Sequence, residues 1–147
     1  MKLGIDEILS QANKLKAKDK RLEFLRKHVS GTLIDVMRLG LQKADFTWIL
    51  TKAKYEYNPS GYVDQQGVLF QSLRKIPRYF LEGNELPHIT DEKRDLLWVQ
   101  FLEALDTGDA KLMESIRQGV WPYRNINESI MKEAFPEVFG AVLPAEE

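Results

Sequence analysis

Two groups of carboxylates are the residues of this chain best suited to acid–base chemistry. Asp91, Glu92 and Asp95 fall within one predicted helical turn, and Asp106 and Asp109 flank a predicted turn. Paired carboxylates can act as general acid and base when burial separates their pKa values. All five also stand near expected helix starts, where acidic side chains stabilise the helix dipole. We therefore expect helix caps and solvated charges here rather than a catalytic site.

The other reactive side chains form no catalytic or metal-binding pattern. The chain has no cysteine, which excludes disulfides, thiolate metal sites and cysteine nucleophiles. His28 and His88 are its two histidines, and neither has a serine or carboxylate placed to partner it. Motifs for a nucleophile elbow, a phosphate loop or a zinc helix are absent. The sequence predicts no enzyme, no cofactor and no metal; an enzyme would need a pocket of converging carboxylates with shifted pKa values.

Aromatic and basic side chains gather in a segment with hardly any aliphatic residue, 51–66, and again at 121–124. Loops longer than about 12–15 residues tend to be functional or disordered, and tyrosine and arginine are enriched in binding hot spots. The alternatives are a lid of tyrosines over the core for 51–66 and packing at a helix junction for 121–124. The predicted partner-binding residues are Lys54, Tyr55, Tyr57, Tyr62, Arg74, Lys75, Arg78, Trp121, Tyr123 and Arg124.

Charge is divided unevenly along a chain whose net charge is only −1. Residues 1–81 carry 15 basic and 8 acidic side chains, whereas residues 82–147 carry 6 and 14. The basic stretch from Lys14 to Lys27 could follow a phosphate backbone, because cation–phosphate attraction dominates nucleic-acid affinity. The alternatives are a solvated helical face and attraction between the two halves within one fold.

Helical periodicity dominates the 147 residues, 44% of which are hydrophobic. We predict an all-α fold, a compact bundle or orthogonal array of about six to seven helices with one long aromatic loop. Residues 1–147 would form a single helical domain, with the long loop at 51–66 and a frayed tail at 140–147. The helices are expected at 5–17, in a short stretch marked by Leu22, Leu25 and Val29, and at 32–44, 68–82, 91–106, 109–118 and after Asn125.

Several residues predict details of these helices. Gly40 weakens the third helix by about 1 kcal/mol relative to alanine, so we expect close packing there. Pro77 should kink or divide the fourth helix. Thr90 should cap the broadly apolar, and therefore central, helix at 91–106. Asn125 and Glu128 have the spacing of a capping box. No apolar run approaches the length of a membrane span, and the N-terminus does not resemble a signal peptide.

Short blocks of the chain resemble a family of small uncharacterised proteins of T-even-like myoviruses, especially cyanophages. The blocks are Thr47-Trp48-Ile49-Leu50 before the tyrosine segment, Leu102-Glu103, Asp109-Ala110, Pro122-Tyr123 and Ala134-Phe135-Pro136, in that order. The chain departs from the family pattern at Thr51, where a proline is usual, and at residues 117–121, where lysines are usual. The resemblance implies a phage protein in the cytoplasm of an infected bacterial host. It carries no activity and no catalytic residues.

The sequence thus predicts a non-enzymatic, phage-type accessory protein that binds a host or phage protein and modulates a host process during infection. A nucleic-acid-binding accessory protein that uses the basic N-terminal half is the alternative. Surplus apolar surface on the 91–106 helix and the aromatic loop would also allow a homodimer.

Overall fold

The structure is a computed structural model in which residues 3–50, 52–58, 69, 73, 75–82 and 89–138 are described, apart from the side chain of Arg78. The all-α fold class is confirmed: these residues form six α-helices and two short helices, with no named strand. The elements are α1 (Ile5–Lys14), α2 (Lys18–Lys27), α3 (Gly31–Leu41), the 3-10 helix η1 (Lys43–Asp45), the π-helix η3 (Ile76–Phe80), α5 (Asp91–Glu103), α6 (Thr107–Arg117) and α7 (Glu128–Ala134).

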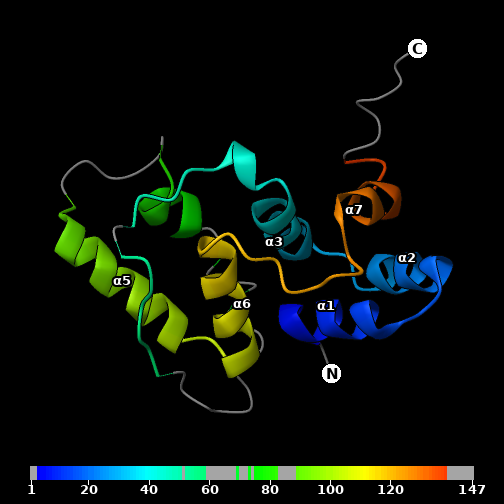
Figure 1. The fold of residues 1–147 in the computed structure, drawn as a ribbon, viewed down its shortest axis with the longest axis horizontal. Helices are drawn as coiled ribbons and strands as arrows, with labels where there is room; N and C mark the ends of the chain where they lie inside the picture. Colours follow the sequence, from blue (N-terminus) through cyan, green and yellow to red (C-terminus); the bar gives the residue numbers. More distant parts are fainter. Residues whose placement is uncertain are drawn as a thin grey trace.

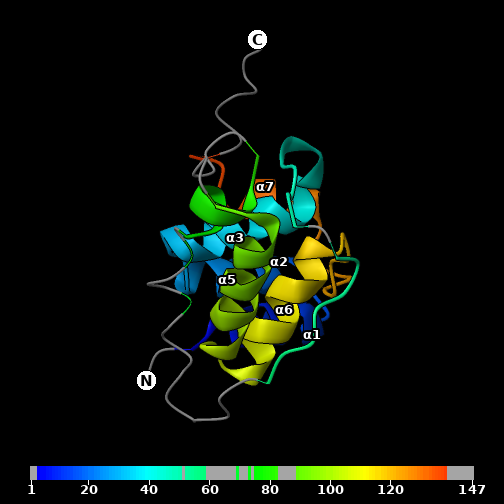
Figure 2. The same cartoon turned by 90° about the vertical axis from the view of Figure 1, so that its left-hand side faces the viewer.

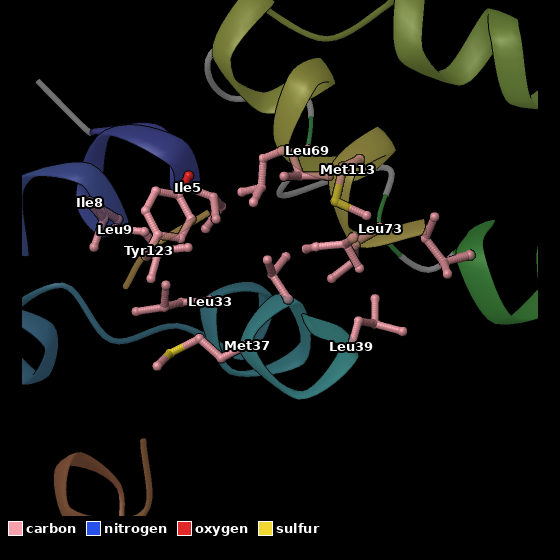
Figure 3. Close-up of a cluster of buried hydrophobic side chains, with 14 of the residues drawn as sticks. Ile5, Ile8, Leu9, Leu33, Met37, Leu39, Leu69, Leu73, Met113 and Tyr123 are labelled. Carbon is pink, nitrogen blue, oxygen red and sulfur yellow. The ribbon is translucent and has the colours of Figure 1, made fainter. Parts of the chain in front are cut away.

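The helices form two groups that meet at α3 and α6 (Figures 1 and 2). Helices α1, α2 and α7 pack together on one side, while α5 lies beside α6 on the other. Helix α6 contacts α1, α3 and α5 and therefore connects the two groups. Buried side chains from all six α-helices join one hydrophobic cluster, part of which is shown in Figure 3. None of the described helices is long and apolar enough to cross a membrane.

Helix ends follow the local chemistry of the sequence, with corrections at the start of α7 and at the end of α1. Thr90 caps α5 as predicted, because its side chain accepts a hydrogen bond from the Lys93 backbone N–H (3.1 Å). The predicted cap at Asn125 is wrong, since Asn127 caps α7 by accepting from the Ile130 N–H (2.9 Å). Asn125 instead binds Asn13 at the end of α1 through two hydrogen bonds of 2.8 and 2.9 Å.

One glycine allows close packing inside α3, and another follows the end of α6. A Cβ atom at Gly40 would overlap the ring of Trp121, which explains the glycine inside α3. Gly119 follows α6 with φ +86°, a conformation that favours glycine. Helix α1 is shorter than the predicted helix at 5–17, because the chain becomes extended at Leu15. The Leu15 carbonyl accepts a hydrogen bond from the Arg21 guanidinium.

The predicted helix at 91–106 differs from expectation in its packing, and the predicted helix at 68–82 is described only in part. The 91–106 segment is not apolar all round: α5 buries Trp98, Phe101 and Leu102, whereas Leu96 is 49% exposed. In the predicted 68–82 helix, Pro77 lies in the first turn of η3, where its missing N–H is tolerated.

After η3 the chain runs extended and pairs with the segment that follows η1. Leu81 forms an antiparallel bridge with Trp48. Hydrogen bonds from Ile49 to Phe80 (3.0 Å) and from Glu82 to Thr47 (2.8 Å) flank it. The predicted tail 140–147 and residues 51 and 59–66 of the predicted loop lie outside the described residues.

Candidate functional site

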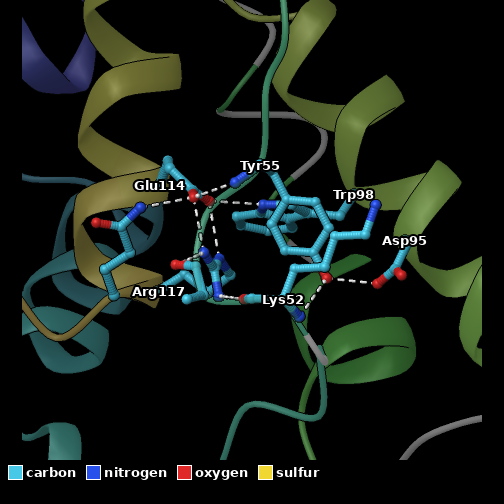
Figure 4. A network of polar contacts seen from close by, with 8 residues as sticks. Lys52, Tyr55, Asp95, Trp98, Glu114 and Arg117 are labelled. Carbon is cyan, nitrogen blue, oxygen red and sulfur yellow. Dashed lines mark hydrogen bonds and ion pairs between the residues drawn. The ribbon is translucent and has the colours of Figure 1, made fainter.

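The described part of the tyrosine segment, residues 52–58, lies against α5 and α6 rather than projecting from them (Figure 4). Tyr55 is 3% exposed, and its hydroxyl hydrogen-bonds the Asp95 carboxylate of α5. Further along, the Asn58 N–H donates to Glu103 (3.0 Å). For Tyr55, the structure therefore corresponds to the lid over the core, and its side chain is not presented to a partner.

Glu114 is the centre of the network that holds this segment. Its carboxylate accepts from the Trp98 indole (2.8 Å), from the Arg117 guanidinium (2.8 and 2.7 Å), from the Gln118 amide (2.8 Å) and from the Tyr55 N–H (3.2 Å). Burial opposes its ionisation, but the donors from Arg117, Trp98 and Gln118 outweigh burial and hold the pKa of Glu114 below its usual value. A buried carboxylate with its oxygens so well satisfied is an anchor rather than a proton donor.

Arg117 extends the anchor to the backbone of the segment. It donates to the carbonyls of Lys52 and Ala53, both at 3.0 Å, and its guanidinium lies 4.7 Å from the centre of the Tyr55 ring. The planar guanidinium thus joins a carboxylate, two carbonyls and an aromatic face.

The second aromatic cluster also packs inside the molecule. Trp121 covers Gly40 and donates to the Ile126 carbonyl (2.6 Å). Tyr123 is 4% exposed, and its hydroxyl hydrogen-bonds the Asp6 carboxylate of α1. Packing at a helix junction, the alternative for 121–124, describes both side chains, whereas Arg124 is exposed.

The remaining predicted partner-binding residues do not form one surface in the part of the chain that the structure describes. Lys54 and Lys75 are exposed, and Tyr57 is half-buried against the core. Burial, together with the charge of Glu114, raises the pKa of Tyr57. Tyr62, Arg74 and the side chain of Arg78 lie outside the described residues.

Part of the basic stretch is used within the fold. Lys18 forms an ion pair with Glu133 of α7 (2.8 Å), and Arg26 donates to the carbonyls of Glu133 and Ala134 at 2.7 and 3.1 Å. Cations at the C-terminal end of a helix also complement its dipole. Attraction between the two halves of the chain therefore accounts for these side chains, while Lys14, Lys16, Lys20 and Lys27 remain exposed.

The carboxylates near helix starts divide into two kinds. Asp106 caps α6 and Asp91 is exposed beside Arg94, in agreement with capping and solvation. Asp109, however, is 1% exposed, and burial raises its pKa to about 8. The expectation of a solvated Asp109 is thus wrong, because α1 packs over the start of α6 and excludes water from it.

A hollow of about 880 Å³ lies between α3 and η3 and was not predicted. Aliphatic and aromatic side chains form most of it, and Thr32, Asp35 and Arg38 bring polar groups from α3. Burial raises the pKa of Asp35 above its usual value, because the opposing effect of the Arg38 charge is smaller. The residues that line the groove are Gly31, Thr32, Asp35, Arg38, Leu39, Phe46, Leu73, Ile76, Pro77 and Leu81. We call it the α3–η3 groove; its only signal in the sequence is the polar pair 35 and 38 on an otherwise apolar helix.

Among the described residues, no three His, Cys, Asp or Glu side chains are placed to hold a metal ion. Comparison with known proteins finds no matching family model, no matching curated protein and no matching solved structure. Function therefore has to be inferred from the geometry of this chain.

Proposed function

We propose that this chain is a non-enzymatic accessory protein that binds an amphipathic helix of another protein in the α3–η3 groove. The groove itself carries the proposal. Leu39, Leu73 and Leu81 line it yet are each only 5–6% exposed, so they form a deep apolar floor. Figure 3 shows Leu39 and Leu73 at one end of the core cluster. Such a floor can take the apolar anchors that a helix presents at i, i+3 and i+4.

The polar groups of the groove favour a protein partner. Asp35 and Arg38 present one negative and one positive charge, i and i+3 on the exposed side of α3. A partner helix with charges of both signs beside its apolar stripe would match them and fix its direction, because complementary charges set specificity more than affinity. The resemblance to small phage proteins suggests a partner among the proteins of an infected bacterium.

Nucleic acid fits this groove poorly. Phosphate binding needs several converging cations, and the groove holds one arginine beside one aspartate among its lining residues. In the basic stretch, Lys18 and Arg26 are already bound to α7. The exposed lysines of residues 14–27 offer an alternative surface for nucleic acid, and they can be tested in parallel.

Gly31 allows the groove to be closed without disturbing the fold. It lines the groove, and a Cβ atom there would have no other atom within 4 Å. We expect Gly31→Trp to fold normally and to place an indole at the mouth of the groove. Gln11→Trp adds the same side chain to an exposed position of α1 and serves as the control.

Peptide display against the immobilised protein tests the proposal without knowledge of the partner. We expect helical peptides with apolar anchors to be selected, and their affinity to fall at least tenfold for Gly31→Trp but not for Gln11→Trp. A charge exchange, Asp35→Lys with Arg38→Glu, should change which peptides are selected. Selected peptides that bind both tryptophan variants equally would refute binding in the groove. Binding of DNA or RNA that weakens steeply with salt and is lost in Lys16→Glu/Lys20→Glu would support the nucleic-acid alternative instead.

A further inference from the structure

The N-terminal ends of α1 and α6 meet at a cluster of three aspartates. Asp109, in the first turn of α6, accepts a hydrogen bond through Oδ1 from the Asp6 backbone N–H of α1 (2.8 Å). Asp106, the cap of α6, accepts through Oδ2 from the Gly108 N–H (3.2 Å). The Asp6 carboxylate accepts from Ser10 (3.3 Å) and from Tyr123. Each of the three aspartates therefore accepts at least one hydrogen bond.

Two oxygens of this cluster have no partner among the described residues. They are Asp106 Oδ1 and Asp109 Oδ2, and both are inaccessible to solvent. Burying a carboxylate oxygen without a hydrogen bond is costly, and two adjacent ionised carboxylates would also repel. A protonated carboxyl group has one O–H donor. One proton between these two oxygens would therefore satisfy both of them.

We propose that Asp106 and Asp109 share one buried proton, and that this proton stabilises the contact between the N-terminal ends of α1 and α6. We call this contact the joint. Protonated Asp109 donates from Oδ2 to Oδ1 of Asp106 and still accepts from the Asp6 N–H through Oδ1. When the proton leaves, Asp6, Asp106 and Asp109 all carry negative charge at the joint. The joint then loosens, so that the contact between the two groups of helices responds to pH.

The groups that surround the pair support a retained proton. Asp6 faces it from α1, and Tyr123 faces Asp6 from the segment before α7. Burial and the Asp6 carboxylate raise the pKa of Tyr123, so its phenol stays neutral and continues to donate. Lys14 and Lys111 line a neighbouring hollow of about 400 Å³ together with Asp6 and Tyr123, but both lysines are exposed. No described cation contacts the pair to replace the proton.

The direction of the pH response follows from the balance at Asp109. Burial raises its pKa, the backbone N–H of Asp6 lowers it, and Asp106 and Asp6 raise it again, to about 8 in total. An unfolded aspartate has a pKa near 3.8. Folding therefore takes up a proton between these values. The stabilisation is complete below pH 3.8 and declines as pH rises toward about 8.

Infrared spectroscopy of protein labelled with ¹³C in the aspartate carboxyl groups tests the shared proton directly. The wild type should show the band of a protonated carboxyl at neutral pH, and raising the pH through about 8 should remove it. Asp109→Asn should lack the band, and its unfolding temperature should lose the fall that the wild type shows between about pH 3.8 and 8. Its amide can donate to Asp106 in place of the proton. Asp45→Asn, at an exposed position of η1, should behave like the wild type.

Asp106→Asn provides a second route if Asp109→Asn does not fold. Asparagine remains a good helix cap, and its amide can donate to an ionised Asp109, so this variant should also lack the band. Absence of the band from the wild type at neutral pH would overturn the proposal. So would a band that persists in both variants, or stability that depends on a divalent cation and is lost with a chelator.

Discussion

Helix α6 carries two buried acids, Asp109 and Glu114, whose pKa values move in opposite directions. Asp109 is 1% exposed and Glu114 is 6% exposed, so their burial is nearly the same. Yet the pKa of Asp109 rises to about 8, whereas the pKa of Glu114 falls below its usual value. Burial alone therefore does not decide which form of a carboxyl group the fold selects.

The difference lies in the neighbours that each acid meets. Glu114 receives five hydrogen bonds, two of them from the positive guanidinium of Arg117. Asp109 receives one, from a backbone N–H, and faces the carboxylates of Asp6 and Asp106. Hydrogen bonds to the charged form favour it, and like charges disfavour it. The fold thus uses one acid as a charged anchor and the other as a neutral joint.

The largest effect on stability is expected from neutralising Glu114, the charged anchor. Glu114→Gln should lower the free energy of unfolding by about 3–5 kcal/mol, because it leaves the Arg117 guanidinium buried without its counter-charge. Glutamine also turns an amide donor toward groups that themselves donate. Chemical denaturation at pH 7 measures the loss, and Asp109→Asn should cost far less. Equal losses in the two variants would remove the distinction between anchor and joint.

The pH dependence of the anchor has the opposite sign to that of the joint. Because the pKa of Glu114 is depressed in the fold, its stabilisation is present above an unfolded pKa near 4.5 and is lost as pH falls through the folded value. Glu114→Gln should therefore flatten the stability profile below about pH 4.5, whereas Asp109→Asn should flatten it between about pH 3.8 and 8.

A smaller effect is expected from filling the space at the joint. A Cβ atom at Gly108 would overlap Oδ2 of Asp6, whose carboxylate is held by Tyr123 and Ser10. Gly108→Ala should therefore cost about 1–3 kcal/mol of unfolding free energy, as overpacking does. Gly31→Ala, in open space at the start of α3, should be neutral or stabilising by about 0.5–1 kcal/mol. A loss no larger at Gly108 than at Gly31 would show that the joint is loosely packed.

Sequence reasoning predicted the elements better than the sites. Periodicity identified the helices, and Gly40 and Thr90 have the local roles expected of them. These features depend on neighbours within a few residues or on the absence of a side chain. The end of α1 was misplaced because the Arg21 guanidinium donates to the Leu15 carbonyl, where the chain turns toward α2. The cap of α7 was misplaced because Asn125 hydrogen-bonds Asn13, 112 positions earlier.

The site residues depend on contacts that no local pattern contains. Asp109 looks like a solvated residue at a helix start, and only its contact with Asp6, 103 positions earlier, makes it a buried acid. Tyr55 and Tyr123 were predicted to bind a partner, but both side chains are buried in the structure. Whether each covers the core or faces a partner depends on carboxylates carried by other helices. The α3–η3 groove is built from elements separated by the aromatic segment, so the sequence offers almost no sign of it.

The two tyrosines allow a matched comparison of anchor and joint. Tyr55 binds Asp95 beside the anchor, and Tyr123 binds Asp6 beside the joint. Tyr55→Phe and Tyr123→Phe should each cost about 1.5–3 kcal/mol, the usual loss for a hydrogen bond to a charged acceptor. Thermal unfolding measures both. Tyr123→Phe should also raise the pH sensitivity near 8, since Asp6 loses a donor and its charge acts more strongly on the pair, whereas Tyr55→Phe should not.

The smallest expected effects come from the outermost donor of each cluster. Gln118 gives one of five hydrogen bonds to Glu114, and Ser10 gives a long one of 3.3 Å to Asp6. Gln118→Ala should cost about 0.5 kcal/mol or less, because four donors remain and Gln118 itself is exposed. Ser10→Ala should cost more, about 1 kcal/mol, because Asp6 then depends on Tyr123 alone at a joint with too few donors. Denaturant titration of the two single variants decides the order. A greater loss for Gln118→Ala would mean that the number of donors does not control these two sites.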